Sequence, residues 1–160
     1  MLTYPKTPSD LPSRDEMRDL TGLEIMQGIL AGKYPSAPIC IPLGYRLFDI
    51  QPGHAVFRGT PTFEHANPMG VVHGGWYGTL LDSAMGCAVL TKVPARHVYT
   101  TLEYKINIVR PIPYGTEIDA ISTASHVGRS TGVAEGQIVG VADGKLYATG
   151  STTCIIMAER

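Results

Sequence analysis

The amino-acid sequence predicts an α+β domain in which an antiparallel sheet of five or six strands curls around one long, mostly apolar helix. Residues 74–90 form an apolar segment rich in small residues. Residues 97–157 contain four long runs dominated by Thr, Val, Ile and Tyr, separated by short turn sequences. A helix that is apolar on several sides belongs inside a sheet rather than on its surface.

The composition is that of a compact globular protein. The chain has 160 residues, of which 44% are hydrophobic and 17% charged, and this is enough for one domain with a buried core. The formal net charge of -1 gives no indication of nucleic acid or an anionic membrane as a partner. The three cysteines, Cys40, Cys87 and Cys154, have no metal-ligand spacing. We therefore expect no disulfide framework, no zinc site and no other cofactor.

The first residues lack the basic-then-apolar order of a signal peptide, and no apolar run is long enough to span a membrane. We therefore expect a cytoplasmic protein that is not embedded in a membrane. Pro5, Pro8 and Pro12 predict an extended N-terminal arm.

Two capping-box sequences follow this arm. "SRDE" at 13–16 and "TGLE" at 21–24 both have the Ser/Thr-x-x-Glu spacing, and apolar residues then recur at helical intervals up to Gly32. The pattern predicts a short amphipathic helix. We expect residues 1–39 to form an N-terminal arm with this helix, and residues 40–160 to form the main domain.

The strands are predicted from alternation and turn chemistry. "YRLFDI" at 45–50 and "AVFRGT" at 55–60 flank the turn sequence "QPGH" and predict a hairpin. Residues 97–111, 116–127, 131–142 and 145–157 predict four longer strands, and "YG", "GRS" and "DG" mark the turns between them. Short turns of this kind favour antiparallel connections.

The apolar segment 74–90 carries one charged side chain, Asp82. A carboxylate that is wholly buried without partners would be neutralised rather than stay charged. We therefore expect Asp82 to lie beside polar partners, in a cleft or at an interface. A lone aspartate in a helix is more often exposed or a packing group than catalytic, so this residue alone does not identify a site.

The predicted helix begins at "HGG", residues 73–75. Unpaired N–H groups at a helix start carry about half a positive charge and can hold an anion or a developing oxyanion, and a double glycine lets a ligand approach. Gly74 and Asp82 are separated by roughly 12 Å along the helix axis, which is too far for both to contact one carbonyl group. Two chains with antiparallel helices about a two-fold axis would bring the aspartate of one to the helix start of the other.

The stretch "HANPMGVVHGGWYGTLLDSAMG" resembles the hotdog-fold acyl-CoA thioesterases of the PaaI (phenylacetate-pathway) type. Their pattern is an Asn, a Gly, a His-Gly-Gly that opens the central helix, and an acidic residue nine positions after the His. The corresponding residues are Asn67, Gly70, His73, Gly74, Gly75 and Asp82. The resemblance extends over roughly residues 40–157.

The resemblance implies a hotdog fold and the hydrolysis of acyl-CoA thioesters to a free acid and CoA. It assigns the polarisation of the thioester carbonyl to the N–H of Gly74, with His73 shaping the site and Asn67 holding substrate or water. Asp82 would act as nucleophile or as general base, and both routes remain open. A hydroxyl on the following strand often assists, and Thr101 matches that position, with Thr100 one residue away.

Substrate contacts and assembly follow from the same resemblance. Arg129 and Ser130 are candidates to bind the CoA part of the substrate, Gly75 is a candidate substrate contact at the helix start, and Tyr77 is a candidate to line the acyl pocket. The expected assembly is a homodimer or a dimer of dimers, such as a homotetramer, with active sites shared between chains. The acyl group is not identified by the sequence.

Two other functions fit the same fold. The first is a non-catalytic acyl-CoA sensor, against which the complete set Asn67, His73, Gly74 and Asp82 argues. The second is a hydratase or dehydratase that uses a catalytic His, which fits an "HGG" turn with an aspartate on the helix less well.

Overall fold

The structure is a computed structural model that describes residues 1–159. Its strands are β1 (Tyr45–Gln51), β2 (His54–Gly59), β3 (His97–Ile108), β4 (Ile118–Val127), β5 (Thr131–Gly140) and β6 (Leu146–Ala158). Its α-helices are α1 (Arg14–Met17), α2 (Gly22–Leu30) and α3 (Gly74–Leu90), with short 3-10 turns at Pro8–Asp10, Pro38–Cys40 and Phe63–His65. The predicted hairpin, central helix and four long strands are all present.

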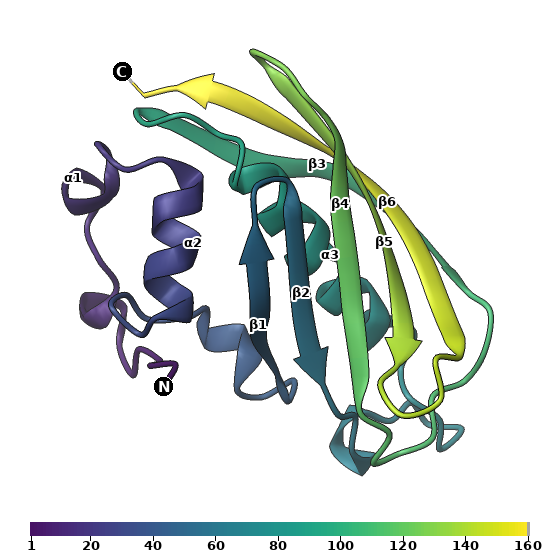
Figure 1. Ribbon diagram of the computed structural model, residues 1–160. Helices are drawn as coiled ribbons and strands as arrows, with labels where there is room; N and C mark the ends of the chain where they lie inside the picture. The colour runs from purple at the N-terminus through teal and green to yellow at the C-terminus, as the bar shows by residue number, and fades with distance from the viewer. Residues whose placement is uncertain (160) are drawn as a thin grey trace.

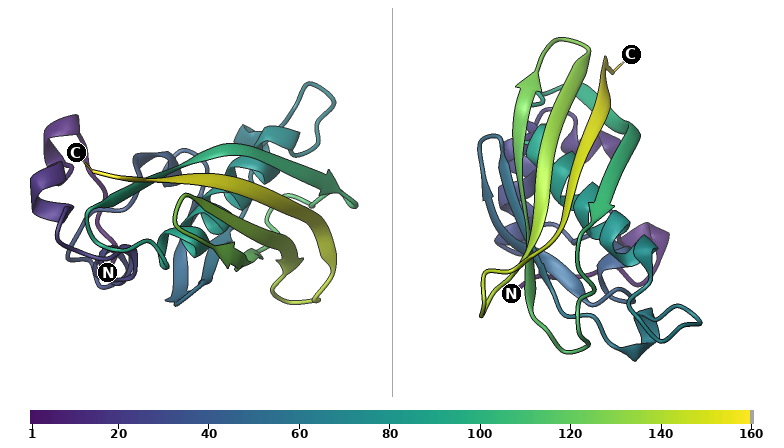
Figure 2. Two further views of the ribbon diagram at one scale, coloured as in Figure 1. Left: turned by 90° about the horizontal axis from the view of Figure 1, so that it is seen from above. Right: turned by 90° about the vertical axis from the view of Figure 1, so that its right-hand side faces the viewer.

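The six strands form one antiparallel sheet in the order β1-β2-β4-β5-β6-β3. The sheet curves around α3, and the two edge strands, β1 and β3, lie on either side of it (Figures 1 and 2). The chain leaves β2, passes through α3 and enters β3 at the far edge, so β3 pairs only with β6 within the described residues. This arrangement is the hotdog architecture.

Helix α3 forms the centre of the core. Leu80, Leu81 and Met85 are fully buried against the inner face of the sheet. Gly136 on β5 faces this helix, and a Cβ added there would lie 3.0 Å from Cγ of Met85. The strands therefore approach the helix closely because glycine leaves the space that larger side chains would occupy.

The N-terminal segment lies beside β1, at the edge of the sheet (Figure 1). Both predicted capping boxes are confirmed: Ser13 caps α1 and Thr21 caps α2, each accepting a hydrogen bond from the N–H of the Glu three residues later. The arm is less extended than the prolines predict. Thr7 and Asp10 form a further capping box around a 3-10 turn with Pro8 at its first position, a place that proline tolerates well.

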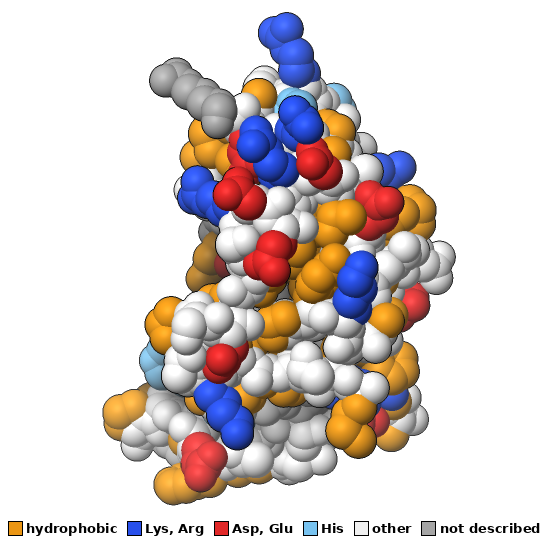
Figure 3. All heavy atoms as spheres, turned by 90° about the vertical axis from the view of Figure 1, so that its left-hand side faces the viewer, with side chains coloured by type: hydrophobic (Ala, Val, Ile, Leu, Met, Phe, Trp, Pro, Cys, Tyr) orange, Lys and Arg blue, Asp and Glu red, His pale blue; other side chains and the backbone are white. Residues whose placement is uncertain are grey.

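Figure 3 shows the face that the N-terminal segment covers. Charged side chains of both signs gather at its upper end, at the level of α1, and hydrophobic side chains are exposed below them.

Across residues 1–159, no helix combines the length and the apolar character needed to cross a bilayer.

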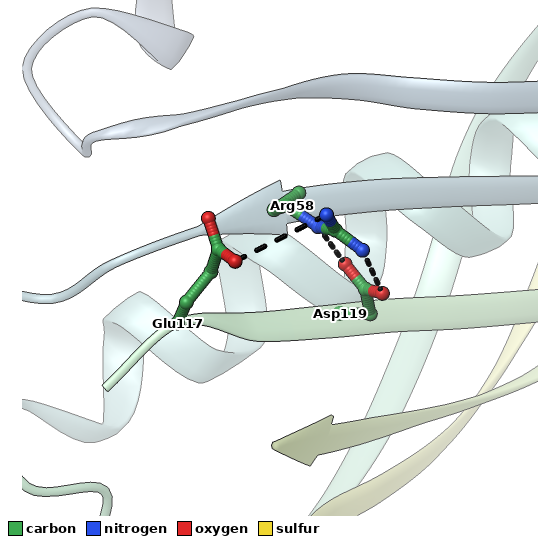
Figure 4. Close-up of polar contacts among 3 residues, drawn as sticks. All are labelled: Arg58, Glu117 and Asp119. Atoms are coloured by element: carbon green, nitrogen blue, oxygen red, sulfur yellow. Dashed lines mark hydrogen bonds and ion pairs between the residues drawn. The ribbon is translucent and has the colours of Figure 1, made fainter. Parts of the chain in front are cut away.

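One ion pair ties β2 to β4 on the outer face of the sheet (Figure 4). Arg58 donates two hydrogen bonds of 2.7 Å to the carboxylate of Asp119, the residue directly opposite on β4. Its guanidinium also stacks on the ring of Phe48, 3.6 Å from the centroid, and lies 4.0 Å from Glu117. This cluster contributes to the sheet and does not include any residue predicted for the functional site.

Candidate functional site

Helix α3 turns one stripe of residues toward the edge strand β3. Gly74, Gly78, Asp82 and Gly86 recur at intervals of four, which places them on one face of the helix. The glycines of this stripe are close to β3 side chains: an added Cβ would lie 3.1 Å from the hydroxyl of Tyr104 at Gly78 and 3.4 Å from that of Tyr99 at Gly86. Asp82 is the one member of the stripe with a side chain, so it fills the space that the glycines leave open.

A side-chain hydroxyl on β3 contacts Asp82. Thr101 Oγ1 donates a hydrogen bond of 3.0 Å to Asp82 Oδ1. Asp82 is half-buried, and its Oδ2 accepts no hydrogen bond from any described residue. Thr100 is exposed on the other face of β3, so of the two predicted hydroxyls only Thr101 reaches the carboxylate. The aspartate is thus held by one oxygen and leaves the other free.

The start of α3 is capped by the side chain of His73. His73 Nδ1 accepts a hydrogen bond of 2.8 Å from the N–H of Gly75, which fixes the ring at the helix start. The N–H of Gly74, at the first helical position, has no hydrogen-bond partner among residues 1–159. This N–H is one of the unsatisfied donors at the positive end of the helix. It can therefore donate a hydrogen bond to the oxygen of a ligand.

Asn67 shapes the loop that leads into the helix. Its Oδ1 accepts hydrogen bonds from the N–H groups of Met69 at 2.9 Å and Val71 at 3.3 Å. The N–H of Asn67 in turn donates to the carbonyl of Val71 at 2.8 Å. Within the described chain, the side-chain oxygen of Asn67 is therefore engaged in the loop, and its amide NH2 is the part left for another ligand.

A cavity of about 250 Å³ adjoins Asp82 at the seam where the two edges of the sheet approach each other over α3. Asp82, Ser83, Gly86 and Cys87 come from the helix, Leu47 and Phe57 from β1 and β2, and Tyr99 and Thr101 from β3. The N-terminal segment supplies the remaining wall, which consists of Met26, Ile29, Ser36, Ala37 and Cys40. Most of these side chains are apolar, and Asp82 is the only carboxylate among them.

The other titratable groups of the cavity are held in their neutral forms. Burial is the main cause that raises the pKa of the Cys87 thiol to about 12, and nearby Cys40 and Asp82 add to it. Burial also raises the pKa of Cys40 and raises that of Tyr99 well above its usual value. At neutral pH these groups carry no charge, so the cavity is an apolar space bordered by a single carboxylate.

The structure places three other predicted residues away from this cavity. Tyr77 is buried in the core, where its hydroxyl accepts a hydrogen bond of 2.9 Å from the N–H of Ile112. Arg129 and Ser130 are exposed in the turn between β4 and β5. Gly132, just after this turn, lies against Val89 near the end of α3, so the turn is at the opposite end of the helix from Gly74. Arg129 and Gly74 are therefore far apart within one chain.

The sequence does not reveal the N-terminal side of the cavity. Met26 and Ile29 lie on the apolar face of α2, and that pattern predicts only that the face is buried, not what it is buried against. A second contact that sequence reasoning missed joins Tyr45 on β1 to Ser83 on α3, whose side-chain oxygens are 3.0 Å apart. The only sequence signal for this contact is that Tyr45 occupies an inward-facing position in the alternating pattern of β1.

Comparisons with known proteins support the fold. Residues 69–146, which contain α3, β3, β4 and β5, match the thioesterase superfamily. A variant of the phenylacetic acid degradation protein PaaI from Thermus thermophilus is 28% identical to this chain, with a TM-score of 0.67. The match covers 74% of this chain and 97% of the PaaI chain. No curated protein sequence matches the chain.

Two further structures share the architecture at lower identity. PaaI from Escherichia coli is 22% identical to this chain, with a TM-score of 0.75, and the match covers 87% of this chain and 98% of the E. coli chain. A hypothetical thioesterase from Streptococcus pneumoniae, solved with coenzyme A, is 23% identical, covers 73% of this chain and 88% of its own, and has a TM-score of 0.65. With its hotdog fold and the matched segment 69–146, this chain is similar to the thioesterase superfamily and, within it, to the PaaI proteins.

Proposed function

We propose that the protein hydrolyses acyl-CoA thioesters to a free acid and CoA. The observation that carries this proposal is the half-buried carboxylate of Asp82, held through one oxygen by Thr101 and bordering an apolar cavity. A fixed carboxylate with a free oxygen can attack a carbonyl carbon or take a proton from water. An apolar space beside it can hold the acyl group while the reaction takes place.

The second half of the proposed site is the start of α3 in another chain. The long edge strand β3 supports such an assembly, because Leu102, Tyr104 and Ile108 on it are exposed to 60%, 44% and 45%. A long, apolar, unpaired edge is a surface on which a second chain can pair. We propose that β3 of one protomer pairs with β3 of its partner, which sets the two α3 helices antiparallel; a dimer of dimers is compatible with this pairing.

In this assembly the thioester carbonyl lies at the helix start of one protomer. The N–H of Gly74 donates to the carbonyl oxygen and stabilises the negative charge that develops there; such a donor is worth about 10²- to 10³-fold in rate. His73 fixes the local backbone, Gly75 leaves room for the ligand, and Asn67 contributes its amide. Asp82 of the partner subunit attacks the carbonyl carbon or activates a water molecule.

The overall reaction balances in either route. The carbon–sulfur bond breaks, and CoA leaves as a thiolate that takes up a proton. The oxygen of the water molecule is incorporated into the carboxyl group of the released acid or into that of Asp82. Arg129 and Ser130 are proposed to contact the CoA phosphates at the rim, because guanidinium and hydroxyl groups bind phosphate well. Tyr77, in the core, is proposed to support the helix rather than to touch the acyl group.

The test is release of free thiol from a panel of aryl- and fatty acyl-CoAs by the purified protein. We expect turnover on part of the panel and a loss of at least about 10²-fold in Asp82→Ala, as expected for removal of a group that acts on the reacting atoms. Asp49→Ala is the matched control, since the carboxylate of Asp49 accepts a hydrogen bond only from nearby Gln51 among described residues. Tight binding without turnover on any thioester would instead identify an acyl-CoA sensor.

A further inference from the structure

The wall of the cavity beside Asp82 comes partly from the N-terminal segment, not from the sheet and central helix alone. Met26 and Ile29 of α2 contribute to its wall together with Ser36, Ala37 and Cys40 of the connector that follows. Helix α2 lies next to β1, so it covers the place where β1 and β3 fail to meet over α3. Without this segment the cavity would be an open groove that exposes Leu47 and Phe57.

We propose that this cavity is the acyl pocket and that α2, chiefly through Ile29, limits the length of the acyl group that the enzyme accepts. The inference rests on the proposed thioesterase function and extends it by naming the substrate class. The occupant is an uncharged acyl group with its carbonyl at Asp82 and its tail against α2.

The volume limits the size of this group. A water molecule occupies about 30 Å³ of liquid, so the cavity of about 250 Å³ has room for roughly eight non-hydrogen atoms. That number corresponds to a medium-length straight chain or to one ring on a short linker. The adenine nucleotide of CoA does not fit in the remaining space and must lie outside.

The chemistry of the wall fixes the charge of this group. Asp82 is the only Asp, Glu, Lys, Arg or His in the lining, and its apolar residues include Met26, Ile29 and Leu47. An acyl group with a terminal carboxylate would have to leave water without a cationic partner, and it would also approach Asp82. The pocket therefore selects against dicarboxylic acyl groups.

Position 29 offers a direct test, because Ile29 is only partly buried and packs against the outside of the core rather than within it. The probes are straight-chain acyl-CoAs of four to twelve carbons, phenylacetyl-CoA and succinyl-CoA. For the wild type we expect kcat/KM to be highest near eight carbons or for phenylacetyl-CoA, and to be at least tenfold lower for succinyl-CoA than for butyryl-CoA. Ile29→Ala should move the optimum to longer chains, and Ile29→Phe should move it to shorter ones, by about fourfold in kcat/KM for each methylene gained or lost.

Ile25→Ala is the matched control. Ile25 is on the same helix and equally part-buried, but it lines a separate hollow with Leu90 and Val93 at the end of α3. The chain-length profile of Ile25→Ala should equal that of the wild type. A profile that stays unchanged in both Ile29 variants, while circular dichroism shows that they are folded, would overturn the inference and leave the thioesterase proposal intact.

Binding separates the inference from the proposed function. S-octyl-CoA, a thioether that cannot be hydrolysed, is titrated calorimetrically into the wild type and the same three variants. We expect Ile29→Phe to weaken binding about tenfold and Ile25→Ala to leave it unchanged. If no acyl-CoA is hydrolysed but binding follows position 29, the pocket assignment stands and the thioesterase proposal fails. If binding is equal in all four proteins, the pocket assignment fails.

Discussion

Thr101 Oγ1 lies 3.0 Å from Asp82 Oδ1 and donates the one hydrogen bond that this carboxylate receives from the described residues. The pair joins the middle of α3 to the edge strand β3, at a point where the neighbouring positions of the helix stripe, Gly78 and Gly86, carry no side chain. The hydroxyl therefore holds the carboxylate through Oδ1 and leaves Oδ2 without a hydrogen bond from the described residues.

Replacing Thr101 by Val removes the hydroxyl but keeps the shape of the side chain. We expect kcat on acyl-CoA to fall by about 10- to 100-fold, the range that corresponds to one hydrogen bond to a charged group. Thr100→Val is the control, because Thr100 is exposed on the other face of β3. Steady-state kinetics should show the loss only at position 101, and an equal loss at both positions would contradict the assigned role.

A second prediction concerns the free N–H at the start of α3. Gly74→Pro deletes this donor at a helical position where proline is well tolerated, and His73 before it already has an extended backbone, with φ -63° and ψ 138°. An added Cβ at position 74 would be 3.6 Å from Cδ1 of Ile108, an ordinary contact. We expect kcat to fall by about 10²- to 10³-fold while the melting temperature stays within a few degrees.

Gly74→Ala is the control for this change, since it adds a similar bulk and keeps the N–H. It should retain most of the activity that Gly74→Pro loses. Equal losses in both variants would mean that the space at position 74 matters and that its donor does not.

How much of this site the sequence predicts depends on whether the signal is local. The spacing of "HGG" and Asp82, together with the double glycine, predicts the helix start and the position of the carboxylate, because both are set by the geometry of one helix. The choice between Thr101 and Thr100 depends on which face of β3 points toward α3. A β-bulge between Thr101 and Glu103 interrupts the alternation of the strand, so the sequence pattern alone does not determine that face. The structure places Thr101 beside Asp82.

The acyl cavity could not be predicted, because its walls come from segments far apart in the chain. Met26 and Leu47 are brought together only by the curvature of the sheet and by the packing of α2 against β1. The amphipathic pattern of α2 shows that one face is buried, but a pattern carries no information on the surface that it meets. The buried position of Tyr77 has the same origin, since its partner Ile112 is remote in sequence.

The shared site makes a third prediction about mixed chains. Asp82→Asn and Gly74→Pro each inactivate both sites of their own homodimer, but a heterodimer of the two contains one intact site. Random exchange of equal amounts should restore activity to about a quarter of the wild-type value. Thiol release is measured after subunit exchange has been verified by mass spectrometry. Exchange without recovery would contradict a site formed between protomers.

The route of hydrolysis can be separated by a single turnover in oxygen-labelled water, our fourth prediction. If Asp82 is the nucleophile and water opens the resulting anhydride at the aspartyl carbon, the label appears on the carboxyl group of the enzyme. If Asp82 activates water, or if water opens the anhydride at the acyl carbon, the label appears in the released acid. The free Oδ2 beside the cavity is compatible with direct attack, and we expect the label on the enzyme. Mass spectrometry of the peptide that contains Asp82 detects it, and label only in the acid would contradict an anhydride that is opened at the aspartyl carbon.

The fifth prediction concerns the stability of the sheet, which is independent of the site. Asp119→Asn removes the charge that faces Arg58 but keeps the size of the side chain, and the two side chains are exposed to only 15% and 20%. We expect the free energy of unfolding to fall by about 1–2 kcal/mol, because a part-buried guanidinium loses two charge-assisted hydrogen bonds while its stacking on Phe48 remains. Glu117→Gln is the control, since Glu117 is half-exposed and 4.0 Å from Arg58, and it should change stability by less than about 0.5 kcal/mol. Urea unfolding measures both values, and equal effects of the two substitutions would show that the bidentate geometry contributes nothing beyond surface charge.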